Sequence, residues 1–134
     1  MRCVFVTFLL LMSCLLAGPA AAQSFADYSG RDLYMRFCAS CHGVTGAGDG
    51  PVGQGLAVMV PDLTTLSRRS GGQMNAAKLR EIIDGRAVVI AHGIRTMPVW
   101  GYEFWVEEGA DVEAEAAVRT IVDQLIAYLR SIQT

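Results

Sequence analysis

The sequence FCASCHG, residues 37–43, decides how this chain is organised. Cys38 and Cys41 are three residues apart, so on a helix their side chains lie on one face, roughly 5–6 Å apart at Cβ. His42 follows directly and adds an imidazole that can bind a metal. The spacing C-x-x-C-H is typical of covalent haem attachment, in which two thiols form thioether bonds to the haem. We therefore predict one covalent haem c on Cys38 and Cys41, with His42 as an iron ligand.

Other uses of a C-x-x-C pair fit this chain less well. A thioredoxin-like redox site needs a strand leading into a helix, and the glycine-rich segment after His42 does not continue such a pattern. A structural zinc site needs four ligands, and beyond residue 22 the only Cys or His residues are Cys38, Cys41, His42 and His92. A disulfide would leave His42 without a role. Disulfide and metal sites remain the alternatives to haem.

Residues 1–22 have the features of a signal peptide. Arg2 supplies the positive start, residues 4–16 form a nearly unbroken apolar run, and Ala20-Ala21-Ala22 matches the small-x-small rule for cleavage. The apolar run is short for a transmembrane span, which needs about 20 residues. We expect cleavage after Ala22 and a periplasmic protein. An uncleaved membrane anchor and a lipoprotein cleavage site before Cys14 remain alternatives.

Residues 23–134 then form a single monohaem cytochrome c domain. The segment has the length of one small domain and carries no repeat and no second C-x-x-C-H. Cys3 and Cys14 leave with the leader, so both remaining cysteines are available to the haem. The whole chain has 11 Lys and Arg against 13 Asp and Glu, a net charge of −2, and no basic cluster of the kind that binds nucleic acid.

The first and last parts of this domain are predicted to be helices that cross. Ser29 followed by Asp32 is a variant of the capping box and predicts a helix from Gly30 that runs into the haem motif. Residues 112–132 carry apolar side chains at steps of three and four, which indicates a long amphipathic helix. Gly30 either permits a close approach of the two helices or merely suits a helix start, and the sequence does not decide between these roles.

Two further segments complete the predicted fold. Residues 43–55 are rich in glycine and form a loop, which we expect to cover the His42 side of the haem. The second imidazole nitrogen of His42 should donate to a backbone carbonyl, and Pro51 is the candidate. A helix is predicted between the cap residue Asn75 and Gly85, with an apolar stripe of Leu79, Ile82 and Ile83. An irregular loop through Trp105 is expected to follow it.

The iron needs a second axial ligand, and five side chains are candidates. Met35 lies on the helix that leads into the haem motif and cannot reach the opposite haem face. Met59 and Met74 are more typical of core packing. Met97 lies in a loop directly before a proline, which stiffens the backbone. We predict Met97 as the ligand, with His92 second.

An aromatic segment follows Met97 and contains Trp100, Tyr102, Phe104 and Trp105. We expect these rings to pack on the haem edge, and Trp100 or Tyr102 to donate to a haem propionate, although core packing explains each ring equally well.

Ligation by His and Met favours an electron carrier over an enzyme. Met raises the reduction potential, and with both axial positions filled the iron has no free site for a substrate. One alternative is a gas- or peroxide-binding haem protein in which Met97 is displaced. Another is a dedicated cytochrome subunit of a larger oxidoreductase complex.

The motifs taken together resemble class I cytochromes c. The resemblance rests on the helix entering CASCHG, the loop GAGDGP, the Met-Pro pair and a last helix with AYL near its end, and it spans roughly Tyr28 to Ile132. It implies an all-α, cytochrome c-like fold in which the N- and C-terminal helices cross, and helices and loops wrap around one haem with an exposed edge.

The same resemblance implies thioether bonds at Cys38 and Cys41 and axial ligands His42 and Met97. It implies redox proteins as partners, such as a dehydrogenase, a quinol-oxidising complex, an oxidase or a reductase, in a periplasmic respiratory chain. Contact with a membrane would then come only through an uncleaved leader or a partner complex. The long Gly85–Met97 loop departs from the smallest members of the family.

Overall fold

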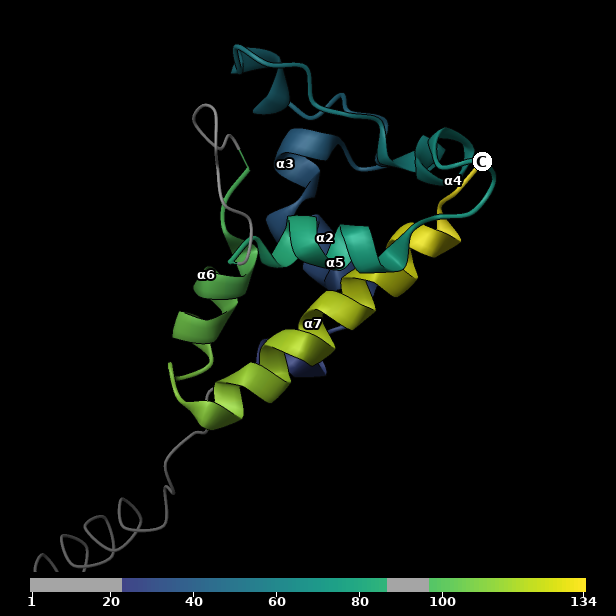
Figure 1. Cartoon of the computed structure of the whole chain (residues 1–134). Coiled ribbons are helices and arrows are strands. Elements are labelled where there is room, and N and C mark those ends of the chain that lie inside the picture. The colour runs from purple at the N-terminus through teal and green to yellow at the C-terminus, as the bar shows by residue number, and fades with distance from the viewer. Residues whose placement is uncertain (1–22, 87–96) are drawn as a thin grey trace, which may run out of the picture.

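The computed structural model describes residues 23–86 and 97–134, and its regular elements in these two ranges are all helical (Figure 1). The all-α prediction is therefore confirmed. The predicted leader, residues 1–22, and His92 lie outside the described residues. The elements in chain order are η1 (Phe25–Asp27), α2 (Gly30–Phe37), α3 (Ala39–His42), η2 (Gly53–Gly55), η3 (Leu63–Thr65), α4 (Leu66–Arg69), α5 (Ala76–Asp84), α6 (Trp100–Glu107) and α7 (Val112–Ser131). Over the described ranges, none of these helices combines the length and hydropathy of a membrane span.

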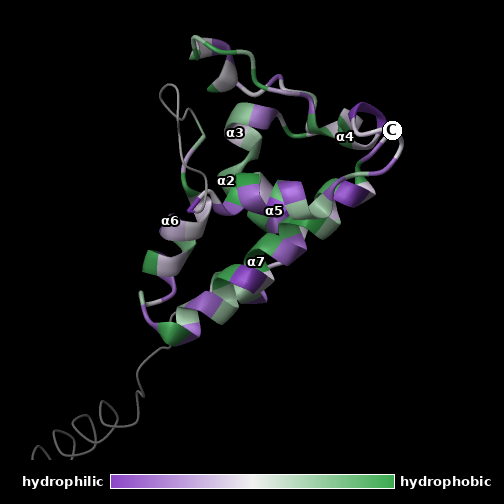
Figure 2. Cartoon of the chain, in the orientation of Figure 1, coloured by the Kyte–Doolittle hydropathy of each residue, from purple (hydrophilic) through white to green (hydrophobic). Residues whose placement is uncertain are grey.

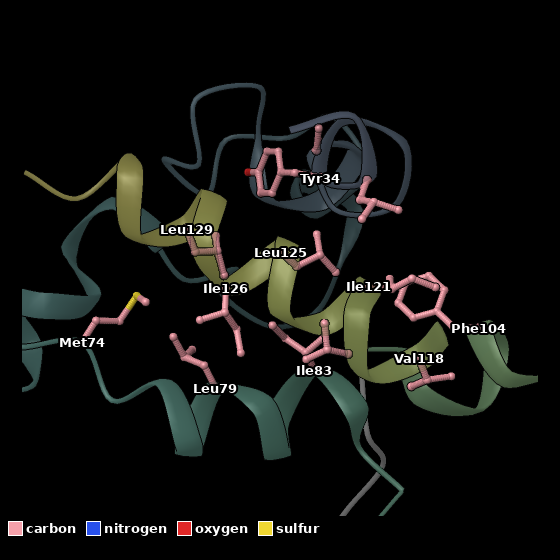
Figure 3. Packing of buried hydrophobic residues seen from close by; sticks show 13 residues of the cluster. Tyr34, Met74, Leu79, Ile83, Phe104, Val118, Ile121, Leu125, Ile126 and Leu129 are labelled. Atoms are coloured by element: carbon pink, nitrogen blue, oxygen red, sulfur yellow. The ribbon is translucent and has the colours of Figure 1, made fainter. Parts of the chain in front are cut away.

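Helix α7 is the element on which the other helices pack. Asp111 caps it by accepting a hydrogen bond from the Ala114 N–H at 2.8 Å. Apolar and polar residues alternate along the helix (Figure 2), and its apolar stripe is buried against α2, α5 and α6. Figure 3 shows this stripe between Tyr34 of α2 on one side and Leu79 and Ile83 of α5 on the other. The predicted long C-terminal helix is confirmed.

Helix α2 starts and crosses α7 as the sequence predicts. The Ser29 hydroxyl accepts from the Asp32 N–H at 3.1 Å and donates to the Asp32 carboxylate at 2.6 Å. A Cβ atom added to Gly30 would collide with the Gln124 carbonyl group, lying 2.7 Å from its carbon. Of the two roles that the sequence left open for Gly30, the structure therefore supports the close approach of α2 and α7.

Helix α5 also has the predicted ends. The Asn75 side chain accepts from the Lys78 N–H at 2.9 Å. Gly85 closes the helix in the left-handed conformation with φ 72°, which glycine adopts without steric cost. Its buried side chains, Leu79 and Ile83, belong to the predicted apolar stripe.

The structure corrects two helix predictions. Helix α2 does not run unbroken into the haem motif, because Cys38 has φ −114° and ψ −37° and separates α2 from α3. Residues 100–107, predicted as part of an irregular loop, form α6 instead. The reason is tertiary: Trp100 and Phe104, four residues apart, both pack on Phe37 of α2, with ring centroids 5.5 and 5.2 Å from it.

Two methionines show why a local pattern cannot decide burial. Both Met59 and Met74 were predicted to be core side chains. Met74 is buried in the core. Met59 is 93% exposed, so its prediction is wrong. The segment around Met59 runs outside the group of helices that pack on α7, and only the tertiary structure determines this position.

Candidate haem site

A cavity of about 340 Å³ lies between α3 and α5. Its wall is predominantly apolar and includes side chains from α2, from residues 56–66, from α5 and from residues 97–100. All four predicted haem residues line it, although they come from two distant parts of the sequence. They are Cys38, Cys41, His42 and Met97.

The single helical turn α3 presents two of these side chains from one short backbone segment. The His42 N–H donates to the Cys38 carbonyl at 2.9 Å, and the Gly43 N–H donates to the Ala39 carbonyl at 2.9 Å. Both cysteines are free thiols and partly buried. Burial, and then the neighbouring Cys41, raises the pKa of the Cys38 thiol to about 12, so this thiol is protonated at neutral pH.

Tyr34 supports the end of α3 from the core. Its side chain is fully buried, and its hydroxyl donates to the Gly43 carbonyl at 2.6 Å. Burial, followed by nearby negative charge, raises the pKa of Tyr34 well above its usual value, so the hydroxyl remains a donor across the accessible pH range. Tyr34 was not predicted as a site residue, because its place in the sequence gives no sign of this polar role, which only the fold reveals.

The carbonyl that pairs with His42 belongs to Pro61, so the prediction of Pro51 is wrong. The Nδ1 atom of His42 lies 3.2 Å from the Pro61 carbonyl oxygen and donates to it. Pro51 is exposed and does not line the cavity. Its neighbour Gly50 packs on the backbone of α3, where an added Cβ would lie 2.6 Å from the Cys41 carbonyl oxygen.

The hydrogen bond to Pro61 determines which nitrogen of His42 is free. Because a carbonyl only accepts, Nδ1 carries the proton and Nε2 keeps its lone pair for a metal. Burial lowers the pKa of His42, while the hydrogen bond to Pro61 raises it in part. A lowered pKa keeps the imidazole neutral at physiological pH, which is the form that binds iron.

A second wall is formed by residues 97–100 and α5. Met97, Pro98 and Trp100 line the cavity together with Ile82 and Ile83. Trp100 stacks on Phe104 with ring centroids 5.7 Å apart, so the structure places it in both of its predicted environments, cavity and core. Its predicted bond to a propionate stays a prediction.

Most of the apolar side chains that line the cavity were not predicted as site residues, among them Ile82, Leu56 and Val58. Ile82 lines the cavity while 40% exposed, and Leu56 and Val58 line it from the segment before Pro61. A detectable signal existed for Ile82, which belongs to the predicted apolar stripe of α5 but lies off the buried face. Met59 also lines the cavity, but its high exposure makes it a poor ligand candidate.

The residues present fit a covalently held haem. Two free thiols, one imidazole with a fixed tautomer and one thioether surround a cavity whose remaining wall is largely apolar, which suits a large apolar macrocycle. In the described ranges, no group of three or more His, Cys, Asp or Glu side chains has the geometry of a metal site.

A comparison with known protein families finds a match over most of the chain. The family model described as Cytochrome C oxidase, cbb3-type, subunit III matches residues 26–118, well over half of the chain. The matched region contains both cysteines, His42 and Met97. Comparison with curated proteins and with solved structures finds no significant match.

Proposed function

The chain belongs to this family of c-type cytochromes, and from that premise we propose that it carries single electrons in a periplasmic respiratory or dehydrogenase-linked chain. The family implies one covalently bound haem c and haem-based electron transfer in a cytochrome c-like fold. When bound, the haem supplies a one-electron couple between ferric and ferrous iron. The donor, the acceptor, the ligands and the compartment belong to the proposal.

In this proposal Cys38 and Cys41 hold the haem by thioether bonds, and His42 and Met97 are the axial ligands. The observation that carries it is the cavity itself, which collects all four side chains although Met97 follows His42 by 55 residues. Pro61 supports the role of His42 because it fixes the Nδ1 proton and directs the free lone pair of Nε2 to the iron.

The proposed ligand set would also favour electron transfer over the transformation of a substrate. With His42 and Met97 as its ligands, the iron would have no open position for a substrate. The thioether favours the ferrous state and gives a relatively high reduction potential. An apolar wall adds to this effect by keeping water from the charged ferric form.

A second candidate, a dedicated cytochrome subunit of a larger oxidoreductase complex, is favoured by an apolar surface beside the cavity. The chain from 50 to 61 contains no charged residue, yet many of its side chains are exposed. The exposed large apolar side chains of this region are Val44, Val52, Leu56, Val58 and Met59. Such a surface is typical of contact with a partner protein.

The export step forms part of the same proposal. Residues 1–22 direct the chain across the membrane, with cleavage after Ala22, and residues 23–134 are the mature cytochrome. Mass spectrometry of the exported protein tests this directly. We expect the mass of a chain that starts at Gln23 and carries one haem. The mass of a chain with a retained leader, or with a lipid on Cys14, would contradict the proposed cleavage.

The optical spectrum of the exported holoprotein tests the ligands. We expect a low-spin, six-coordinate haem with a methionine–iron charge-transfer band and no change on adding CO. Met97→Ala should abolish the band and make the ferrous haem bind CO, while His92→Ala, the control, should do neither. A high-spin or CO-binding wild-type haem would instead favour the ligand-binding alternative with a displaceable Met97.

A further inference from the structure

The end of α5 and the start of α6 are packed tightly against each other through Asp84 and Gly101. A Cβ atom added to Gly101 would collide with the Asp84 carboxylate, and would lie 2.8 Å from the Asp84 backbone carbonyl oxygen. The residue before α6, Val99, offers no side-chain cap. The Asp84 carboxylate therefore adds a negative charge to that of Glu103 in the first turn of α6, at the positive end of the helix.

Arg86 joins this contact to a third helix. Its guanidinium donates to the Asp84 carboxylate at 2.7 and 3.1 Å and to the Glu115 carboxylate at 2.6 and 3.1 Å. Glu115 lies in the first turn of α7. The side chains of Asp84 and Arg86 are only 28% and 31% exposed. A planar guanidinium that pairs with two carboxylates is more directional than a single surface ion pair.

This arrangement, the Asp84–Arg86–Glu115 bridge, lies close in sequence to the predicted iron ligand. Met97 precedes α6 by three residues, and the stiff Pro98 connects them. Helix α6 is also held by aromatic packing, because the rings of Trp100 and Phe104 pack on the ring of Phe37 in α2. The first turn of α6 is thus held by aromatic packing on α2 and by the bridge on α5 and α7, and both constrain where the Met97 backbone lies.

We propose that the Asp84–Arg86–Glu115 bridge is a positioning device for Met97, which sets how firmly the thioether stays on the iron. The inference rests on the proposed role of Met97 as a ligand. Its consequence is that a change at Arg86, which is not a cavity residue, alters the stability of methionine ligation more than it alters the fold.

Arg86→Gln tests the proposal in the exported holoprotein, and the chain offers a matched control. Arg80 pairs with Asp123 and likewise connects α5 to α7, but Asp123 lies eight residues further along α7 than Glu115. Arg80→Gln removes the same charge from the same helix pair. Three quantities are measured in both variants: the intensity of the methionine–iron band as the pH rises, CO binding to the ferrous protein, and the thermal midpoint.

We expect Arg86→Gln to weaken methionine ligation by roughly two- to fivefold, the range expected for a partly exposed ion pair. The band should disappear at a lower pH, and CO should bind more strongly by a similar factor. Arg80→Gln should leave both quantities unchanged. Arg86→Lys should fall between wild type and Arg86→Gln, since it keeps the charge but loses the planar fork.

Equal effects of Arg86→Gln and Arg80→Gln on the band and on CO binding would overturn the proposal, even if Arg86→Gln alone lowered the thermal midpoint. If Arg86→Gln yields no holoprotein, Glu115→Gln replaces it, because that variant keeps the contact between Arg86 and Asp84. A failure of the proposed ligand role of Met97 gives a different result. The methionine–iron band would then be absent from the wild type or would survive in Met97→Ala.

Discussion

The two walls of the haem cavity are built in different ways. The His42 wall comes from one continuous stretch, residues 38–61, in which backbone groups bind one another and glycines allow close contact. The Met97 wall depends on α5, α6 and α7, and is fixed by aromatic rings and by ionic side chains. The first wall is therefore held mainly by backbone contacts, whereas the second is held by side-chain pairs that can be removed one at a time.

The largest expected effect is on the His42 wall and comes from Gly50→Ala. The added Cβ would lie 2.5 Å from the Ser40 carbonyl oxygen and 2.6 Å from that of Cys41, and backbone atoms cannot move aside as a flexible side chain does. We expect the free energy of unfolding of the holoprotein to fall by about 3 kcal/mol, the upper end for overpacking. Gly55→Ala is the control, because nothing lies within 4 Å of its added Cβ. Denaturant unfolding that gave equal values for both variants would show that the His42 wall is not tightly packed.

A smaller effect is expected where the core supports α3. Tyr34→Phe removes the hydroxyl that donates to the Gly43 carbonyl at 2.6 Å and leaves that carbonyl with the weaker hydrogen bond from the Gly46 N–H at 3.2 Å. The expected loss is about 1 kcal/mol, the usual net contribution of one hydrogen bond. Tyr128→Phe is the matched control, since Tyr128 packs on Tyr34 with ring centroids 5.0 Å apart while its hydroxyl makes none of the described hydrogen bonds that support α3. Denaturant unfolding of the two variants measures the difference, and a loss below about 0.5 kcal/mol for Tyr34→Phe would contradict the support role.

The Met97 wall should show a dependence on acid pH that comes from Asp84. Hydrogen bonds from Arg86, partly opposed by burial, hold the pKa of Asp84 below its usual value. A carboxyl whose pKa is lower in the folded state stabilises the fold above its unfolded pKa of about 3.9. This contribution decreases as the pH falls through that value towards the folded pKa.

Asp84→Asn tests this dependence. The free energy of unfolding of each holoprotein is measured at pH 7 and at pH 3. From pH 7 to pH 3 this free energy should fall more in the wild type than in the variant. The difference should be small, because the pair is partly screened by solvent. An identical loss in both proteins would mean that the bridge does not depend on the charge of Asp84.

The smallest effect is expected at Met59, an exposed methionine that lines the cavity. A substitution there tests whether lining the cavity is enough to make a methionine an iron ligand. Met59→Gln should change the free energy of unfolding by no more than about 0.5 kcal/mol, as for other exposed sites. It should leave the methionine–iron band intact, in contrast to Met97→Ala. Loss of the band in Met59→Gln would make Met59 the ligand and would remove Met97 from the site.

The features that the sequence alone determined are those that depend on neighbours three or four residues apart. The spacing of Cys38, Cys41 and His42, the cap at Asn75 with Gly85, and the apolar period of α7 all belong here, because a helix brings such residues together wherever it forms. These features were sufficient to predict an all-α cytochrome c-like fold and a haem c, and the family match supports both.

Only the tertiary structure decided which distant groups meet. The carbonyl for His42 lies 19 residues away at Pro61, and no local rule favours it over Pro51. Residues 100–107 form a helix because their rings pack on Phe37, and Arg86 pairs with Glu115 across 29 residues. Such pairs depend on how the chain folds back on itself, since burial and hydrogen-bond geometry are properties of packed elements and not of their separate sequences.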